Sequence, residues 1–457
     1  MQDGAAVTLQ STGTLPLELS EDGTMVLGQV ESADLGADNQ VPLTLGSGTV
    51  FQGIDAAWLS VENGLLLFNA WRDETNLYET VATSANAHTG AQMLWRIPNE
   101  VLRESPDLRK LTEALDILAA EGNARTADQV LAAAAGAGTA ALGTALVGDV
   151  ERQLQSIRNR TTSMGVNPAM EHDFPLFNAW VNAEGDLSEL DASGTEAGYT
   201  LSSWGGTVGF DVDVNDYLTA GMAFSAMYGD YESKSPDHAK GDIDTCYLSL
   251  FGRYAARRWT HTLVGTIGWA DVELKRSVDY GAGSYSTSGS SDGLGFGMLY
   301  ELGYVIPLDE DSSSCLQPIV NISYRHAGID AYDESGSDAG LHVGRQDMDV
   351  VTFGLGARAQ TYAMEDVYNR RCLLEARVLF KLDAGDVRSH NNVSLLADRA
   401  RGGRVRSEEM GRFGVEMGAG MTIPIGVDTG SLFMDAGVGL RSRAYEVNGT
   451  VGYRLSF

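Results

Sequence analysis

The amino-acid sequence predicts a mainly β fold, a 12-stranded antiparallel transmembrane β-barrel with a helix threaded through its lumen. Three observations predict this fold class. The C-terminal part of the chain alternates apolar and polar side chains, the connections between its strand candidates alternate between long and short, and a charged helix of membrane-spanning length precedes the first strand. Before that helix we expect a short helical junction, preceded by a β-rich, solenoid-like N-terminal segment.

The final stretch of the chain shows the alternation most clearly. Apolar or small residues fall on one side of an extended strand, and polar residues fall on the other. A strand of this kind suits a wall between lipid and a polar lumen. The first side carries Tyr445, Val447, Gly449, Val451, Tyr453, Leu455 and Phe457, and the second carries Glu446, Asn448, Thr450, Gly452, Arg454 and Ser456.

Twelve segments from Phe174 onward are predicted as the strands of the barrel. Counted along the chain, the first, third and further odd-numbered connections are about 12 to 28 residues long, as expected for external loops, except for a short last one. The even-numbered connections are about 2 to 7 residues long, as expected for turns at the other end of the barrel. The segments lie near 175–185, 199–213, 217–229, 242–255, 258–274, 293–307, 315–327, 348–362, 369–382, 411–425, 431–442 and 445–457. Long external loops are therefore predicted near 186–198, 230–241, 275–292, 328–347 and 383–410.

The alternation also assigns side chains to the two faces of the barrel wall. Aromatic residues near strand ends are predicted to form an interfacial girdle: Trp180, Tyr217, Tyr228, Tyr254, Trp259, Trp269 and Tyr362. Charged residues of both signs are predicted to face the lumen: Arg325, Arg358, Glu375, Arg377, Lys381, Glu416, Asp435 and Arg454. Frequent lumen glycines would leave the room that a threaded helix needs.

Residues 139–165 are predicted as a pore or linker helix. Apolar residues such as Leu142, Leu146 and Val150 line one helical face, and about 25 residues span roughly 38 Å, enough to cross a bilayer core. The charged residues exclude contact with lipid and suit a polar lumen, although an amphipathic surface helix would show the same pattern. The polar residues of the predicted pore helix are Asp149, Glu151, Arg152, Gln155, Arg158, Asn159 and Arg160.

The remaining domain boundaries follow from changes in pattern. Residues 1–80 show short strand-like runs between turn signals, and residues 81–138 show helical spacing, with Ser105-Pro106 opening a helix that stops at Gly122. The barrel is assigned residues 174–457.

Composition excludes several functional classes. A formal net charge of -30 argues against nucleic-acid binding. No nucleophile elbow, zinc-protease motif or P-loop is found, so we expect neither enzymatic activity nor a cofactor, and the 3 cysteines show no metal-binding spacing. The first residues do not resemble a signal peptide, from which we expect a mature or truncated chain.

The order of these segments resembles the classical monomeric autotransporters of type V secretion. The segment Arg152–Arg160 is similar to their linker helices, and the C-terminal residues Thr450, Gly452, Tyr453, Leu455 and Phe457 resemble the signal read by the β-barrel assembly machinery. The resemblance implies a monomeric translocator in the outer membrane of a Gram-negative bacterium, in contact with lipid and lipopolysaccharide. It also implies assembly with periplasmic chaperones, and export of the N-terminal segment, the passenger, to the cell surface.

Two questions stay open at this point. Some family members cut the passenger at an Asn-Asn pair inside the pore, whereas the pair here, Asn391-Asn392, lies in a predicted outer loop, so we expect an attached passenger. The alternative function is an outer-membrane porin or channel with an accessory N-terminal domain.

Overall fold

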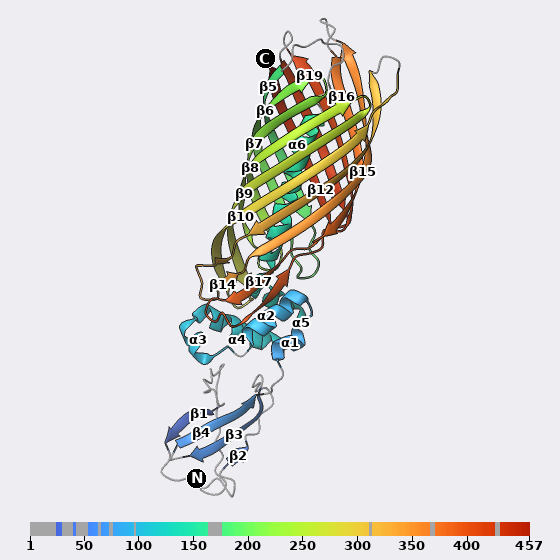
Figure 1. Cartoon of the computed structure of the whole chain (residues 1–457). Coiled ribbons are helices and arrows are strands. Elements are labelled where there is room, and N and C mark those ends of the chain that lie inside the picture. The colour runs from blue at the N-terminus through green and yellow to red at the C-terminus, as the bar shows by residue number, and fades with distance from the viewer. Residues whose placement is uncertain are drawn as a thin grey trace.

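The computed structural model describes residues 24–29, 40–42, 54–62, 65–72, 76–95, 97–162, 176–309, 313–365, 371–425 and 430–457. Residues 1–23, part of the predicted β-rich N-terminal segment, therefore lie outside the described residues. The described part forms a long barrel, with a group of helices at one end and a small sheet beyond them (Figure 1).

Long antiparallel strands close into a barrel around a central helix. Each strand pairs with its neighbours in the sequence, and closure comes from the pairing of the first strand with the last. The short strand β11 (Ile306–Pro307) extends the same sheet. The barrel strands are β5 (Leu176–Leu190), β6 (Gly198–Asn215), β7 (Leu218–Lys234), β8 (Lys240–Ala256), β9 (Trp259–Asp279), β10 (Ser284–Tyr304), β12 (Ser314–Ile329), β15 (Gln346–Glu365), β16 (Arg371–Gly385), β19 (Phe413–Ile425), β20 (Gly430–Arg441) and β21 (Ala444–Ser456). The predicted barrel of 12 antiparallel strands is confirmed.

Several strands continue beyond their predicted ends, which corrects the predicted loop lengths. Segments 230–241 and 275–292 were predicted as external loops, but most of their residues extend β7, β8, β9 and β10 as paired strands. Backbone pairing continues there although the apolar signal of a lipid-facing strand has ended. We call the end of the barrel with these extensions the cap end and the opposite end the turn end.

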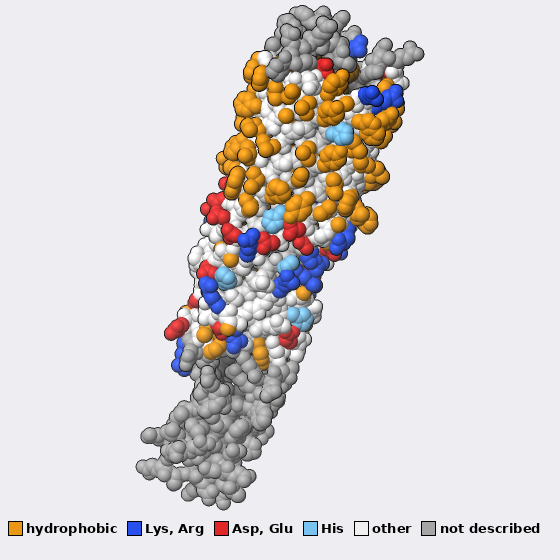
Figure 2. Space-filling model, viewed as in Figure 1, with side chains coloured by type: hydrophobic (Ala, Val, Ile, Leu, Met, Phe, Trp, Pro, Cys, Tyr) orange, Lys and Arg blue, Asp and Glu red, His pale blue; other side chains and the backbone are white. Residues whose placement is uncertain are grey.

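The outer surface of the barrel carries a broad apolar band (Figure 2). Leu355 and Phe380, paired across β15 and β16, are 64% and 61% exposed, while inward-facing neighbours such as Thr352 are buried. Toward the cap end the band stops at a belt of charged side chains. An apolar band bounded by charge is the surface expected of a membrane-spanning barrel.

The predicted aromatic girdle is correct for most of its members and wrong for two. Tyr217, Tyr228, Tyr254, Trp259 and Trp269 are about half exposed on the outer surface. Trp180 is buried, because it shares the inward face of β5 with Asn178 and Asn182. Tyr362 lies on the same face of β15 as inward-pointing Arg358 and is half-buried. An aromatic residue near a strand end therefore belongs to the outer girdle only if the alternation of the strand also directs its side chain outward.

A helical cap, residues 76–141, covers the cap end. It contains α1 (Leu77–Val81), α2 (Ala85–Leu94), α3 (Asn99–Glu104), α4 (Pro106–Ala120), α5 (Ala124–Ala134) and the 3-10 helix η1 (Ala137–Ala141). The cap packs on a four-stranded sheet built from barrel connections (Figure 1). This cap sheet has the order β13 (Tyr332–Asp333), β14 (Leu341–Val343), β17 (His390–Leu395) and β18 (Gly402–Arg406).

The described residues of the N-terminal segment between positions 24 and 72 lie in β-strands. Its described strands, β1 (Thr24–Gln29), β2 (Gln40–Pro42), β3 (Ile54–Glu62) and β4 (Leu65–Arg72), form a sheet of order β1-β4-β3-β2. They pair antiparallel, an arrangement that differs from the parallel rungs of a β-solenoid.

Candidate functional site: a lumen occupied by a charged helix

Helix α6 (Leu142–Thr162) runs lengthwise inside the barrel (Figure 1). Its 21 residues correspond to roughly 32 Å. At the cap end Gly143 donates its backbone N–H to Gln346, and at the turn end Arg160 lies 3.8 Å from Asp211 of β6. Almost every residue of α6 is buried, including its charged ones. The chain therefore passes once through the lumen before β5 begins at the turn end.

The apolar face of α6 packs on a glycine stripe in β10. A Cβ added to Gly295 would lie 2.7 Å from Val150 Cγ2, and one added to Gly297 would lie 2.8 Å from both Val150 and Leu154. Real Cβ atoms do not approach so closely, so these two positions allow the helix backbone to come near the wall. Lumen glycines thus leave the room for the helix that the sequence predicted.

Glu151 joins α6 to three cations of the wall. It forms ion pairs with Arg325 of β12, with Lys381 of β16 at 2.8 Å and with Arg441 of β20 at 2.9 Å. Arg325 and Arg441 also pair with Asp383, at 3.3 and 2.9 Å. All five side chains are buried or nearly so, which makes each charge dependent on its partners.

A second charge cluster surrounds Arg158, nearer the turn end. Its guanidinium pairs with Glu416 of β19 and lies 3.8 Å from Glu301 of β10. Glu416 also pairs with Lys381 at 2.7 Å, which links this cluster to the first one. Arg358 continues it along the wall through Glu301, at 2.9 Å.

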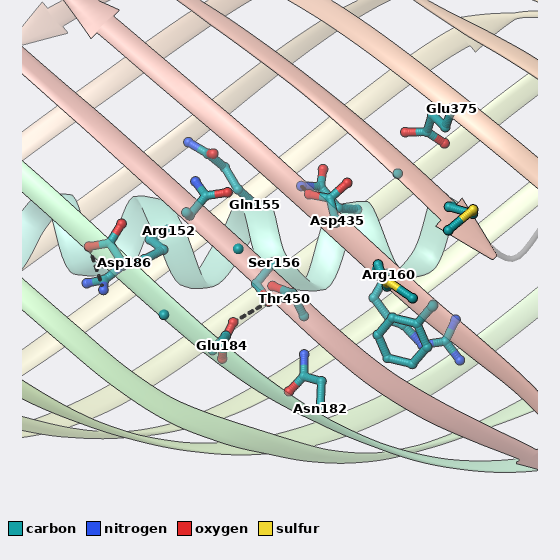
Figure 3. A pocket seen from close by; sticks show the side chains of 18 of the residues that line it. Arg152, Gln155, Ser156, Arg160, Asn182, Glu184, Asp186, Glu375, Asp435 and Thr450 are labelled. Atoms are coloured by element: carbon teal, nitrogen blue, oxygen red, sulfur yellow. Dashed lines mark hydrogen bonds and ion pairs between the residues drawn. The ribbon is translucent and has the colours of Figure 1, made fainter. Parts of the chain in front are cut away.

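Toward β5 and β19–β21 the contacts between α6 and the wall are made by long polar side chains around a cavity (Figure 3). Arg152 pairs with Asp186 at 2.8 Å, and Ser156 donates to Glu184 at 2.7 Å. The Arg160 guanidinium lies over the rings of Trp180 and Phe433, 5.2 and 4.8 Å from their centroids. Cation–π contact of this kind explains why an aromatic residue is found on the polar side of the wall.

The remaining predicted site residues lie on the same lumen surface. Asn159 donates to Asp435 at 3.1 Å, and Asp435 in turn pairs with Arg377 at 2.6 Å. Gln155 donates to Glu151 at 3.2 Å within α6. The others form four ion pairs: Asp149 with Arg152, Glu375 with Arg358, and Arg454 with both Asp211 and Asp213.

Several members of these charge clusters were absent from the prediction. Glu301, Asp383 and Arg441 follow the inward parity of their strands and could have been found by extending it. Asp186 was assigned to a loop, because the predicted first strand ended at residue 185, whereas β5 continues to Leu190.

The residues that resemble the assembly signal lie at the end of β21. Tyr453, Leu455 and Phe457 point outward and are exposed, with Phe457 72% exposed. Thr450 lines the cavity, and a Cβ at Gly452 would meet the Phe433 ring at 2.2 Å. The backbone N–H of Phe457 donates to Phe177 at 2.9 Å, so the last residue is paired with the first barrel strand.

Comparisons with known proteins match the barrel part of the chain. A family model described as the autotransporter β-domain matches residues 179–437. The translocator domain of the autotransporter NalP from Neisseria meningitidis has a TM-score of 0.51 at 15% identity, over 68% of this chain and 97% of that chain, which shows the shared fold. The transport unit of the autotransporter AIDA-I from Escherichia coli is similar at a TM-score of 0.43 and 13% identity, over 66% of this chain and 97% of that chain.

An extracellular serine protease of Serratia marcescens is 25% identical over 187 residues, which is 40% of this chain. The aligned part makes up 17% of that relative, so this chain spans only a small part of its length. The description of the relative as a protease therefore belongs to the relative as a whole.

Proposed function

The chain belongs to the autotransporter β-domain family, and we propose that its barrel exports its own N-terminal segment through the outer membrane and anchors that segment at the cell surface. The β-domain of this family is an outer-membrane translocator. The further parts of the proposal are the export of this particular segment and the closure of the pore by α6 once export is complete.

The observation that carries the proposal is a charged helix buried from end to end inside the barrel. Glu151, Arg158 and Arg160 would each cost several kcal/mol in contact with lipid, but in the lumen they find charged or aromatic partners on the wall. A porin has no need for a chain segment that spans its pore. A translocator that retains the last exported segment would contain one.

The orientation of the barrel follows from the same reasoning. The N-terminal segment and the helical cap lie at the cap end, so we assign this end to the cell surface and the turn end to the periplasm. In this assignment residues 1–80 are the end of the passenger, 81–138 the junction, 139–165 the pore helix and 174–457 the barrel. The apolar band would contact lipid, and the charged belt would meet the headgroup region and lipopolysaccharide.

Assembly of the barrel is expected to use the outward-facing end of β21. Thr450, Gly452, Tyr453, Leu455 and Phe457 would be recognised by the β-barrel assembly machinery after delivery by periplasmic chaperones. Support comes from their position on the strand that closes the barrel.

Conductance across a planar bilayer tests the closure of the pore. The full chain should conduct weakly, and a chain beginning at residue 174, which lacks α6, should conduct strongly because only side chains of the wall remain in the lumen. Both chains must first show the change in electrophoretic mobility on heating that marks a folded barrel.

Two results would contradict the proposal. Equal and large conductance in both chains would mean that α6 leaves the pore in a membrane, and would favour the porin. Equal and small conductance would mean that the wall, rather than the helix, closes the pore.

A further inference from the structure

The helical cap and the cap end of the barrel share one hydrophobic core. Leu108 and Leu111 of α4 and Leu131 of α5 belong to the same buried cluster as Val278 of β9 and Leu341 of β14. The barrel side also contributes Tyr280, Tyr285, Tyr332, Ala339, Val343, Val393, Leu395 and Val405. Removal of the barrel would therefore expose much of the apolar surface that the cap helices bury.

Helix α4 receives its N-terminal cap from the barrel. Its own N-cap residue, Ser105, makes no capping hydrogen bond with its side chain. Instead Asp338, in the connection between β13 and β14, accepts the backbone N–H groups of Asp107 and Leu108, at 3.1 and 3.0 Å. These are the second and third residues of the helix, the positions that an N-cap side chain normally satisfies.

Barrel residues also satisfy the ends of the next cap elements. Arg276 of β9 donates to the carbonyl of Ala133 in the last turn of α5, at 2.8 Å. Asp237, in the connection between β7 and β8, accepts the N–H of Gly138 in η1, at 3.1 and 3.0 Å from its two oxygens. Both Arg276 and Asp237 are buried, and Arg276 is held by an ion pair with Glu334 at 2.6 Å.

Within helix α2, two side chains bond to backbone groups of the barrel connections. Asn86 is fully buried and makes three hydrogen bonds: to the carbonyls of Thr195 and Arg406, at 2.8 and 3.0 Å, and from the N–H of Arg406 at 2.9 Å. Thr89 donates to the carbonyl of Arg404 at 2.7 Å. A Cβ at Gly403 of β18 would lie 2.6 Å from Thr89, so α2 lies directly against the cap sheet.

Helices α2 and α5 are too short to be stable on their own, and α4 is only at the limit of sufficient length. Helices α2 and α5 have 10 and 11 residues, and α4 has 15. Isolated helices of fewer than about 12 to 15 residues are marginal in water. We propose that the cap end of the barrel is a folding site for residues 76–141, which become stably helical only when docked on it.

This inference rests on the proposed function in one respect, the assignment of the cap end to the cell surface. A segment that cannot fold before it reaches that surface stays extended enough to pass through the pore. Once docked, it holds the outer end of α6 and opposes a return of the chain into the lumen. The barrel would then hold the N-terminal segment through two separate contacts, the lumen and the cap.

Hydrogen exchange of the full chain in detergent, read by mass spectrometry, tests the folding site. In Asp338→Ala, α4 should exchange about tenfold faster because its cap is lost, and α5, which Asp338 does not touch, should be faster as well. The barrel strands should keep their rates. Asn86→Ala, a change on the cap side, should have the same effect on α2 and α5.

The matched control is Asp330→Ala. This residue directly follows β12, in the long segment that joins β12 to β15 and also contains Asp338; it is exposed and lies 3.9 Å from Arg345 of the same segment. It should leave exchange in the cap unchanged.

Wild-type rates in α4 and α2 of the two variants would overturn the proposal, because the cap would then keep its fold without the barrel. Faster exchange confined to the first turn of α4 would overturn it as well, as simple fraying of one helix end. These outcomes do not depend on conductance, so a failure of pore closure by α6 would be recognised separately.

Discussion

Among the charged side chains of α6, Glu151 forms ion pairs with the largest number of described wall residues. It is buried and faces Arg325, Lys381 and Arg441, from three different strands. Replacing one member of a buried charged group leaves the others uncompensated, which costs more than the loss of an exposed pair. The attachment of α6 to the wall should therefore be sensitive to this position.

Glu151→Gln should weaken the folded, helix-filled state by about 3 kcal/mol, because an amide cannot balance the charge of three cations. The loss should be visible as a lower temperature for the electrophoretic shift of the folded barrel, and as openings in bilayer recordings. Glu232→Gln is the control, since Glu232 pairs with Lys240 at the surface, where both side chains are more than half exposed. Equal destabilisation by both changes would show that the lumen pair contributes no more than a surface pair.

At the level of whole elements, α6 packs closely on β10 in the lumen. A helix backbone comes close to a strand only where the strand has no side chains in between. Gly293, Gly295 and Gly297 of β10 provide such positions. They lie against Leu146, Val150 and Leu154 of α6. The helix is therefore displaced toward this wall, and the ion pairs on the other sides act over longer side chains.

Gly297→Val should displace α6, because its Cβ alone would lie 2.8 Å from Val150 and Leu154. The expected result is increased conductance of a barrel that still folds. Gly265→Val, on β9, is the matched control, since no atom lies within 4 Å of its added Cβ. A closed pore in both variants would mean that the wall yields instead of the helix.

At the scale of the whole molecule, the barrel closes through the two ends of its sequence. β21 pairs with β5 along almost its whole length, and Phe457 forms backbone hydrogen bonds with Phe177. Closure thus requires the last residues of the chain, and the Phe457 ring points outward, away from the core.

Phe457→Ala should reduce the amount of folded barrel in outer membranes of cells, measured by heat-dependent mobility, because a residue that we propose is recognised during assembly would be lost. The same variant should refold in detergent like the unchanged chain, because the exposed ring contributes little to the packed interior. Tyr445→Ala, at the other end of β21, serves as the control and should assemble normally. A refolding defect in detergent as large as the defect in cells would assign Phe457 to stability rather than to recognition.

The barrel and its helix could be predicted because membrane and lumen impose a two-residue alternation that is local in sequence. Charged lumen residues such as Arg325 and Arg358 follow from it directly. The predicted strand ends were wrong where a strand continues beyond its lipid-facing part, because its outward-facing residues are no longer apolar there. Asp186 was assigned to a loop, and the extensions of β9 and β10 were read as connections, although backbone pairing alone continues them.

The contacts of the cap could not be predicted, for a different reason. Asp338 caps a helix about 230 residues earlier in the chain, and Arg276 satisfies a carbonyl 143 positions away. Neither side chain shows a local pattern that differs from that of a solvated loop residue. Such pairings depend on tertiary structure, and only the folded chain brings them together.

Because α6 lies off-centre in the lumen, the two halves of the barrel contact the helix in different ways. The half from β8 to β15 includes the glycine stripe on which the apolar face of the helix packs closely. The half that includes the junction of β5 and β21 meets the helix through extended polar side chains and the cavity shown in Figure 3. If the barrel opens laterally, we expect β5 and β21 to separate from each other. The helix would then stay packed on the opposite half of the wall.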